Sequence, residues 1–172
     1  MNLESKTIKM RLVQPDDAKF IHSLRTNEKY NSHLSKITGD VNQQRKWIEK
    51  YKVLEKESKE FYFIIEKLDG MPCGTVRVYD LTDNSFCWGS WILNENKTKY
   101  SAIESALLVY KFGFDILDYS ESHFDVRKAN EKVLAFHKKM GAVEYKEDSD
   151  NYYFRVSKFS IDKVRKKFSK LL

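Results

Sequence analysis

Hydrophobic and polar residues alternate near the start of the chain and then change to a helical spacing. The alternation at Ile8, Met10 and Leu12 predicts a strand over residues 8–14. Pro15 and the two aspartates after it are typical of a helix N-terminus, so we expect a helix to begin there. Its expected apolar face is Phe20, Ile21 and Leu24.

A second helix and three strands are predicted in the middle of the chain. Asp40 and Gln43 resemble a capping box. The inward face of this helix is expected to be Trp47, Ile48, Tyr51 and Leu54. The pattern then changes to period two, interrupted by turn sequences, which predicts an antiparallel meander. Its strands are expected over residues 61–66, 74–79 and 86–93.

The last part of the chain predicts three helices and three more strands. We expect Ser101 to cap a long helix and residues 123–126 to form a strand before the next helix. Residues 143–145 and 152–156 follow as a strand pair, and Ser160 is expected to cap the final helix. The expected inward faces of the first and last of these helices are Ile103, Ala106, Leu107, Tyr110, Phe114 and Leu117, and Ile161, Val164, Phe168 and Leu171.

This order of elements predicts one α/β domain over residues 1–172, with a mixed, mostly antiparallel sheet flanked by helices. The strand-helix-strand unit from Phe86 to Val126 is expected to be a parallel, right-handed crossover. The sequence contains no linker, internal repeat or low-complexity tract.

Composition and charge exclude several classes of protein. The chain carries 31 Lys and Arg against 25 Asp and Glu, a formal charge of +6, but the lysines are scattered, so we expect no nucleic-acid partner. Cys73 and Cys87 are too few for a disulfide framework or a zinc cluster, so we expect reduced core thiols, no metal site and a cytoplasmic location. The N-terminus lacks a signal-peptide segment, and no apolar run is long enough to span a membrane.

One helix carries a histidine on its apolar stripe. Val133, Phe136, His137 and Met140 share a face by their spacing. The pattern alone is compatible with a core histidine bonded to a backbone carbonyl and with a functional one.

The loop of residues 94–101 joins a predicted strand to a helix N-terminus. The first amides of a helix lack partners and its dipole favours negative charge, so such a loop can bind an anion. Lys97 and Lys99 add positive charge, although the same features also describe an ordinary polar loop.

Two motifs and the order of elements over nearly the whole chain resemble the GCN5-related N-acetyltransferase (GNAT) family. The matching residues are V126-R-K-A-N130 with Val133, Phe136, His137, Lys139 and Gly141, and W91-I-L93 through Ser101 and Ala102. The resemblance implies a GNAT-like fold and acetyl-CoA as cofactor. The residues implied to bind it are Trp91, Ile92, Leu93, Lys97, Lys99, Tyr100, Ser101, Ala102, Asn130, Phe136 and Lys139.

Two positions depart from the family pattern. The loop contains no glycine where the family usually has Gln/Arg-x-x-Gly-x-Gly/Ala, so its backbone must approach phosphates without that freedom. His137 stands where the family most often has a tyrosine that is thought to protonate the departing thiolate. An unperturbed imidazole titrates near pH ~6.5, so the resemblance implies that His137 is the general acid or holds the thiolate by hydrogen bonding. Asn130 is expected to cap its helix or to bond the pantetheine arm.

The implied reaction is direct acetyl transfer to a primary amine, with backbone amides of residues 88–93 polarising the thioester carbonyl. The strand over residues 86–93 has no carboxylate to act as base. Asp80 and Asp125 are candidates, although Asp80 could be a turn residue and water could serve instead.

The N-terminal region resembles a branch that acetylates amino groups of nucleotide-linked deoxyamino sugars, through residues 12–17, 23–27, 37–38 and 61–65. The same region also resembles acetyltransferases of ribosomal protein N-termini. The resemblance to the nucleotide-sugar branch makes a small-molecule amine the expected partner. The candidate substrate-binding residues are Arg25, His33, Arg77 and Trp88.

Some alternatives remain open at this point. Strand alternation predicts that Trp88 and Trp91 lie on opposite faces, so at most one should face the cleft. Trp88 could stack on a sugar or lie in the core, and Arg77 could bind a diphosphate or pair with a neighbouring acid. The acceptor could be a protein N-terminus or a polyamine, or the domain could be a non-catalytic acyl-CoA or nucleic-acid binding module. The last helix could support a homodimer.

Overall fold

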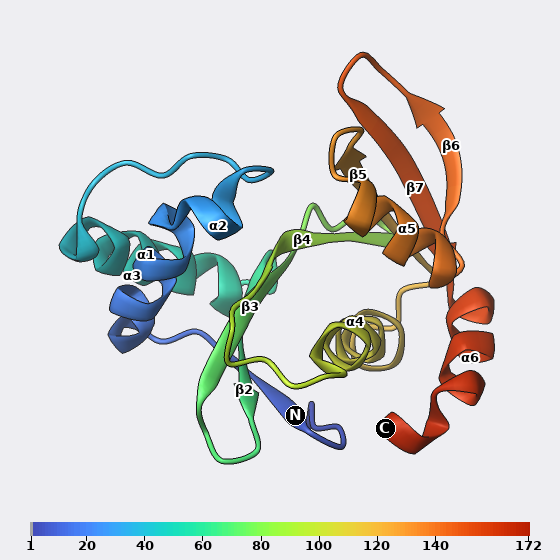
Figure 1. Ribbon diagram of the computed structural model, residues 1–172, viewed down its shortest axis with the longest axis horizontal. Helices are drawn as coiled ribbons and strands as arrows, with labels where there is room; N and C mark the ends of the chain where they lie inside the picture. Colours follow the sequence, from blue (N-terminus) through green and yellow to red (C-terminus); the bar gives the residue numbers. More distant parts are fainter. Residues whose placement is uncertain (1) are drawn as a thin grey trace.

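The computed structural model describes residues 2–172, which form a seven-stranded mixed sheet in the order β1-β2-β3-β4-β5-β7-β6 (Figure 1). β4 and β5 run parallel, and the other neighbouring strands are antiparallel. The predicted mixed sheet, meander and parallel crossover are therefore confirmed. The strands are β1 Ile8–Leu12, β2 Phe61–Lys67, β3 Pro72–Tyr79, β4 Ser85–Leu93, β5 Glu121–Arg127, β6 Val143–Glu147 and β7 Asn151–Ser157.

Helices cover both faces of the sheet, with α1 and α3 on one side of β2 and β3 and α4 on the other (Figure 1). α2 is a single turn that the polar sequence did not predict. A π-helical turn, η2 Phe112–Ile116, continues α4. The α-helices are α1 Ala18–Thr26, α2 Glu28–Asn31, α3 Val41–Lys56, α4 Ser101–Lys111, α5 Glu131–Lys139 and α6 Lys158–Lys167.

β2 supplies side chains to two separate cores. Phe61, Phe63 and Ile65 pack towards α4, whereas Tyr62 and Ile64 pack against α1 and α3. A strand covered on both faces is expected to be a nearly continuous apolar run, which is how residues 61–66 read. The two cores hold the two helical layers in fixed positions on opposite faces of the sheet.

Several predicted details differ in the structure. Trp47 and Leu54 are 40% and 37% exposed, so only Ile48 and Tyr51 of the predicted face of α3 are buried. Ser101 is the first residue of α4 rather than its N-cap. The cap of α6 is the side chain of Ser157, which accepts the backbone N–H of the predicted cap, Ser160. Residues 2–172 contain no helix that is long and apolar enough to cross a membrane.

Replacing Gly113 with alanine should lower the free energy of unfolding by about 1–3 kcal/mol, because the added Cβ would overlap the fully buried ring of Phe86. Urea denaturation measures this change. The control is Ile116→Ala in the same turn, where the side chain is 43% exposed and the cost should stay below about 1 kcal/mol. Equal stability of the two variants would contradict this description of the core.

Candidate active site

A cleft opens where β4 and β5 separate. The two strands pair over Ser85–Cys87 and Glu121–His123, and within residues 2–172 their later residues do not pair with each other. Backbone groups along the facing edges are therefore left to bind a ligand. The cleft has a volume of about 280 Å³. It brings together six of the predicted site residues: His33, Trp88, Trp91, Asp125, Asn130 and His137.

A bulge in β4 determines which side chains face the cleft. Between the pairs Thr75–Ile92 and Arg77–Gly89, β3 advances two residues and β4 three, so β4 carries one extra residue. Ser90, in the middle of this stretch, has a φ of 48°. The period-two prediction that Trp88 and Trp91 lie on opposite faces is therefore wrong. Their ring centroids lie 5.5 Å apart.

His137 lies inside an aromatic cage and is 4% exposed. Its ring centroid is 4.3 Å from that of Phe124, 5.1 Å from Trp88, 5.6 Å from Phe136 and 6.3 Å from Trp91. Burial lowers the pKa of His137 to about 3, because charging the imidazole there would cost its hydration. The expectation of a protonated imidazole near neutral pH is therefore corrected for the free protein, in which the ring is neutral.

The Nδ1 atom of His137 is buried and has no hydrogen-bond partner among residues 2–172. The alternative prediction, a core histidine bonded to a backbone carbonyl, therefore does not hold for this nitrogen. An unpaired buried polar atom costs free energy unless a ligand or water pairs with it. This cost is a reason to connect His137 with ligand binding rather than with packing alone.

Side chains hold the glycine-free loop over residues 94–100. The Asn94 side chain accepts the backbone N–H of Asn96 at 2.9 Å, and the Ser101 hydroxyl accepts that of Thr98 at 2.8 Å. These short-range bonds fix the turn before α4 without a left-handed glycine. The sequence did not reveal this substitute for the family's glycines.

The start of α4 is also tied to the N-terminal segment. The buried carboxylate of Glu104 accepts the backbone N–H of Thr7 at 2.8 Å, and the Thr7 hydroxyl bonds to Thr98 at 2.7 Å. The first amides of α4 have no intrahelical partner, and Lys97 and Lys99 lie exposed beside them. This end of α4 can therefore accept an anionic group such as a phosphate.

The two candidate bases occupy different surroundings. Asp125 is exposed on β5 and lines the cleft. Asp80 lies at the turn after β3 with a φ of 49°, and its Oδ2 atom is 3.0 Å from Nε2 of His123. Asp80 is therefore a turn residue paired with His123, outside the residues that line the cleft. The described residues hold no cluster of three or more His, Cys, Asp or Glu that could bind a metal ion.

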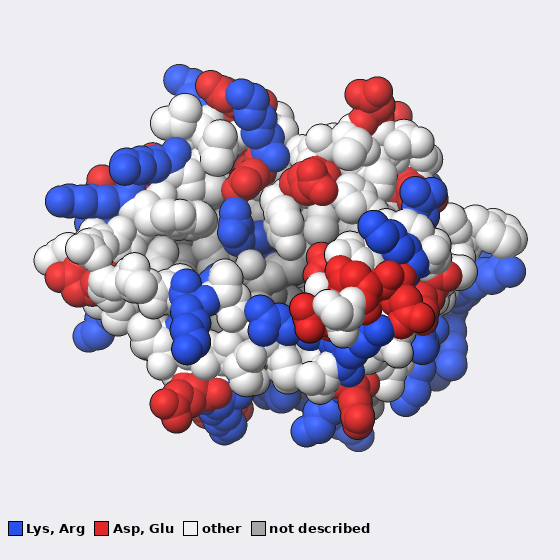
Figure 2. Space-filling model, turned by 90° about the horizontal axis from the view of Figure 1, so that it is seen from above, with Lys and Arg blue, Asp and Glu red and all other residues white. Residues whose placement is uncertain are grey.

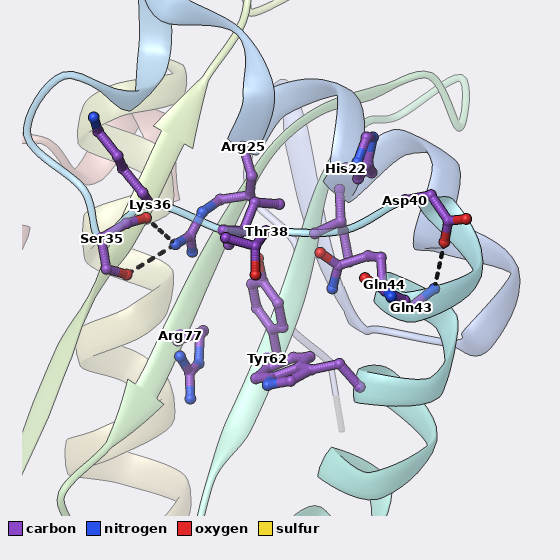
Figure 3. Close-up of a pocket in the computed structure, with 13 residues that line it drawn as sticks. His22, Arg25, Ser35, Lys36, Thr38, Asp40, Gln43, Gln44, Tyr62 and Arg77 are labelled. Atoms are coloured by element: carbon purple, nitrogen blue, oxygen red, sulfur yellow. Dashed lines mark hydrogen bonds between the residues drawn. The ribbon is translucent and has the colours of Figure 1, made fainter.

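Other predicted residues lie around the cleft or away from it. Ile92 is buried, Tyr100 is 40% exposed and Lys139 is exposed at the end of α5. Arg25 and Arg77 line a neighbouring pocket of about 360 Å³ between α1, α3 and the β2–β3 pair (Figure 3). Tyr79, Leu34 and Ser35 also line the cleft, and the sequence did not predict them. One signal could have indicated that Tyr79 lies at the site. It follows the predicted substrate-binding residue Arg77 by two positions, so the two side chains share a face of the strand.

The unusual burial of His137 predicts how stability depends on pH. The unfolded chain binds a proton on His137 below about pH 6.5, whereas the folded protein resists doing so until about pH 3. Between pH 7 and pH 5, the free energy of unfolding should therefore fall by about 2 kcal/mol more in the wild type than in His137→Phe. Urea denaturation at both pH values measures the difference. Parallel pH dependence of the two proteins would contradict a buried neutral imidazole.

The chain is similar to acetyltransferases of known fold. A family model described as "Acetyltransferase (GNAT) domain" matches residues 7–143. A solved structure of apo FdhC, described as a nucleotide-linked sugar GNAT, is 49% identical and superposes with a TM-score of 0.94, covering 100% of this chain and 98% of that one.

The chain also resembles more distant acetyltransferases. The SPbeta prophage-derived uncharacterized N-acetyltransferase YokL of Bacillus subtilis (strain 168) is 26% identical over 138 residues, 79% of this chain and 76% of that protein. Spermidine N-acetyltransferase from Vibrio cholerae, solved with CoA and spermine, is 18% identical with a TM-score of 0.78, covering 90% of this chain and 97% of that one. Because the family model spans most of the sequence, this chain belongs to the GNAT family and is an acetyl-CoA-dependent N-acetyltransferase.

Proposed function

We propose that this enzyme acetylates the amino group of a nucleotide-linked deoxyamino sugar. The observation that carries the proposal is the 49% identity, over the whole chain, to a nucleotide-linked sugar GNAT. A cleft with a buried histidine at one wall and an exposed carboxylate at the other is compatible with acetyl transfer to an amine.

The residues at the cleft fit acetyl-CoA. The amides of Ala102 and Ile103 at the start of α4, with Lys97 and Lys99 in the loop before them, suit its phosphates. The free backbone edge of β4 suits the amide-bearing pantetheine arm. The Nδ1 atom of His137, which has no partner among the described residues, could form a hydrogen bond with a polar group of the coenzyme at the aromatic cage. When bound, acetyl-CoA supplies an activated acetyl group as a thioester.

His137 is assigned to the departing sulfur. It enters the reaction neutral and can donate an N–H hydrogen bond to a sulfur at the cage. A thiolate beside the ring would raise the pKa of the imidazole, so His137 could take up the proton that the amine loses, relayed by water, and pass it to the sulfur. This role keeps the expected acid function but makes the charge on His137 depend on the bound ligand.

The amine must lose a proton before or as it attacks. Asp125 is the acidic side chain on the wall of the cleft, so we assign it to receive this proton directly or through water. Backbone N–H groups of β4 beyond the bulge would polarise the carbonyl oxygen of the acetyl group.

Turnover with a defined set of acceptors tests the substrate. Release of the coenzyme thiol should accompany 3-amino or 4-amino deoxysugar nucleotides, whereas spermine and a peptide with an N-terminal alanine should give rates at least about tenfold lower. The second pocket favours this ranking, because its two arginines, buried Arg25 and half-buried Arg77, repel a polycation. No turnover on any amino-sugar nucleotide, with turnover on either alternative, would overturn the proposed substrate.

Replacing His137 with phenylalanine should lower kcat about 100-fold while changing the KM for acetyl-CoA less than about threefold. Phenylalanine fills the aromatic cage but offers no proton, so packing is preserved while the N–H donor is lost. Steady-state kinetics measures both constants, with exposed Lys138→Ala on the next residue as the matched control. An unchanged kcat would make His137 a packing residue.

A further inference from the structure

A second pocket lies beside the catalytic cleft and is built from different elements. It is formed by α1, the segment over residues 35–40, α3, β2 and β3 (Figure 3). Ser35 lines both cavities, so a single extended ligand could enter both. The proposed mechanism uses only the cleft, which leaves this larger pocket without a role.

Two arginines give the pocket its chemistry. Arg25 is 7% exposed, and its Nη2 donates to the backbone oxygen and the hydroxyl of Ser35 at 2.8 and 3.0 Å. The Nη2 of Arg77 donates to Glu60 at 2.6 Å. The Nε atoms of both arginines are buried and have no partner within residues 2–172.

The hydroxyl of Tyr62 is a third unpaired polar atom in the same pocket. Tyr62 is 2% exposed, and its hydroxyl has no hydrogen-bond partner in the described part of the chain. Burial raises the pKa of Tyr62, so the hydroxyl keeps its proton and can donate. Three buried donors without acceptors are costly, and one ligand rich in oxygen atoms would satisfy them together.

The charge around the pocket favours an anion. Lys36 adds to the two arginines, whereas the acid in the lining, Asp40, already accepts the backbone N–H of Gln43 as the cap of α3. Figure 2 shows Lys and Arg side chains in and beside a hollow on the upper face of the molecule. Arginine pairs with phosphate oxygens through two parallel N–H bonds, which lysine cannot do.

The pocket also offers surfaces for a flat ring. Trp47 lines it and is 40% exposed, and the side chain of Arg77 lies over the Trp47 ring at 5.2 Å. The amide side chains of Gln43 and Gln44 lie on the same wall and can both donate and accept hydrogen bonds. A base stacked on an aromatic ring and bonded at its edge would use all of these groups.

We infer that this pocket binds the nucleoside diphosphate part of the acceptor, with Arg25 and Arg77 on the phosphates, while the amino sugar passes Ser35 into the cleft. This inference rests on the proposed function and deepens it. It assigns recognition of the nucleotide to α1 and α3 and the chemistry to β4, β5 and α5.

Calorimetric binding of thymidine 5′-diphosphate and UDP tests the site. Titrations are run with saturating CoA, because a nucleotide could otherwise occupy the coenzyme's own site. At least one nucleotide should bind, and Arg77→Gln should raise its Kd at least about tenfold. Binding should weaken as salt increases. A nucleotide that binds only when CoA is absent would overturn the assignment.

Exposed lysines provide variants that do not disturb the fold. Lys36→Gln in the pocket should raise the Kd about threefold or more, whereas Lys166→Gln on α6, which lines neither cavity, should leave it unchanged. Equal affinities of wild type, Lys36→Gln and Arg77→Gln would exclude this pocket.

Kinetics separates this inference from the proposed function. If sugar nucleotides are acetylated and Arg77→Gln and Lys36→Gln leave their KM unchanged, the pocket assignment fails and the proposed function stands. If both variants lose nucleotide binding but no sugar nucleotide is acetylated, the proposed function fails and the nucleotide pocket stands.

Discussion

β4 runs beside β5 for only three residue pairs, and this short contact positions the candidate active site. Beyond Cys87 and His123 the strands follow different partners, because β4 continues along β3 while β5 continues along β7. A parallel pair that ends early leaves two free backbone edges facing each other. The extra residue in β4 then turns Trp88 and Trp91 to the same face, where they surround His137.

α4 supports this arrangement from beneath the sheet (Figure 1). It is buried on nearly all sides, so its position is fixed by packing, and its first turn is held by the contact between Glu104 and Thr7. The loop before it uses Asn94 and Ser101 side chains where most relatives are expected to use glycine. A rigid loop that leads into a helix N-terminus can bind phosphates whichever way the rigidity is obtained.

The two cavities differ in the state of their polar groups. In the cleft, an aromatic cage keeps His137 neutral and leaves its Nδ1 atom without a partner among the described residues. In the neighbouring pocket, Arg25 and Arg77 are partly paired with Ser35 and Glu60 and each keeps a buried Nε atom without a partner among the described residues. The first environment suits a proton that must move, and the second suits a fixed anionic group. Ser35 lines both cavities, so the two ends of one extended ligand could lie in the two environments.

Local patterns in the sequence determined most of the fold. Alternation gave the strands, Asp40 gave the cap of α3, and the motif from Val126 to Gly141 indicated the family, which the family model confirms. Each of these signals depends on residues that are neighbours along the chain, so it can be read from the sequence without knowing how the chain packs. The predicted caps at Ser101 and Ser160 lie shortly after the observed N-caps, Tyr100 and Ser157. Several hydroxyls lie near each helix start and can bond to a backbone N–H there, so the sequence alone does not single out the cap.

Only the tertiary structure decided the features on which the chemistry depends. The bulge in β4 exists relative to the register of β3, so alternation within β4 alone could not place Trp91. The pKa of His137 follows from rings on β4, β5 and α5 that meet only after folding. Arg25 lies in α1 and Arg77 in β3, far apart along the chain. They share a pocket because α1 packs over β2 and β3. The sequence therefore determined the fold and family, whereas burial and register, which are properties of distant residues brought together, determined the charge state and the grouping of the site residues.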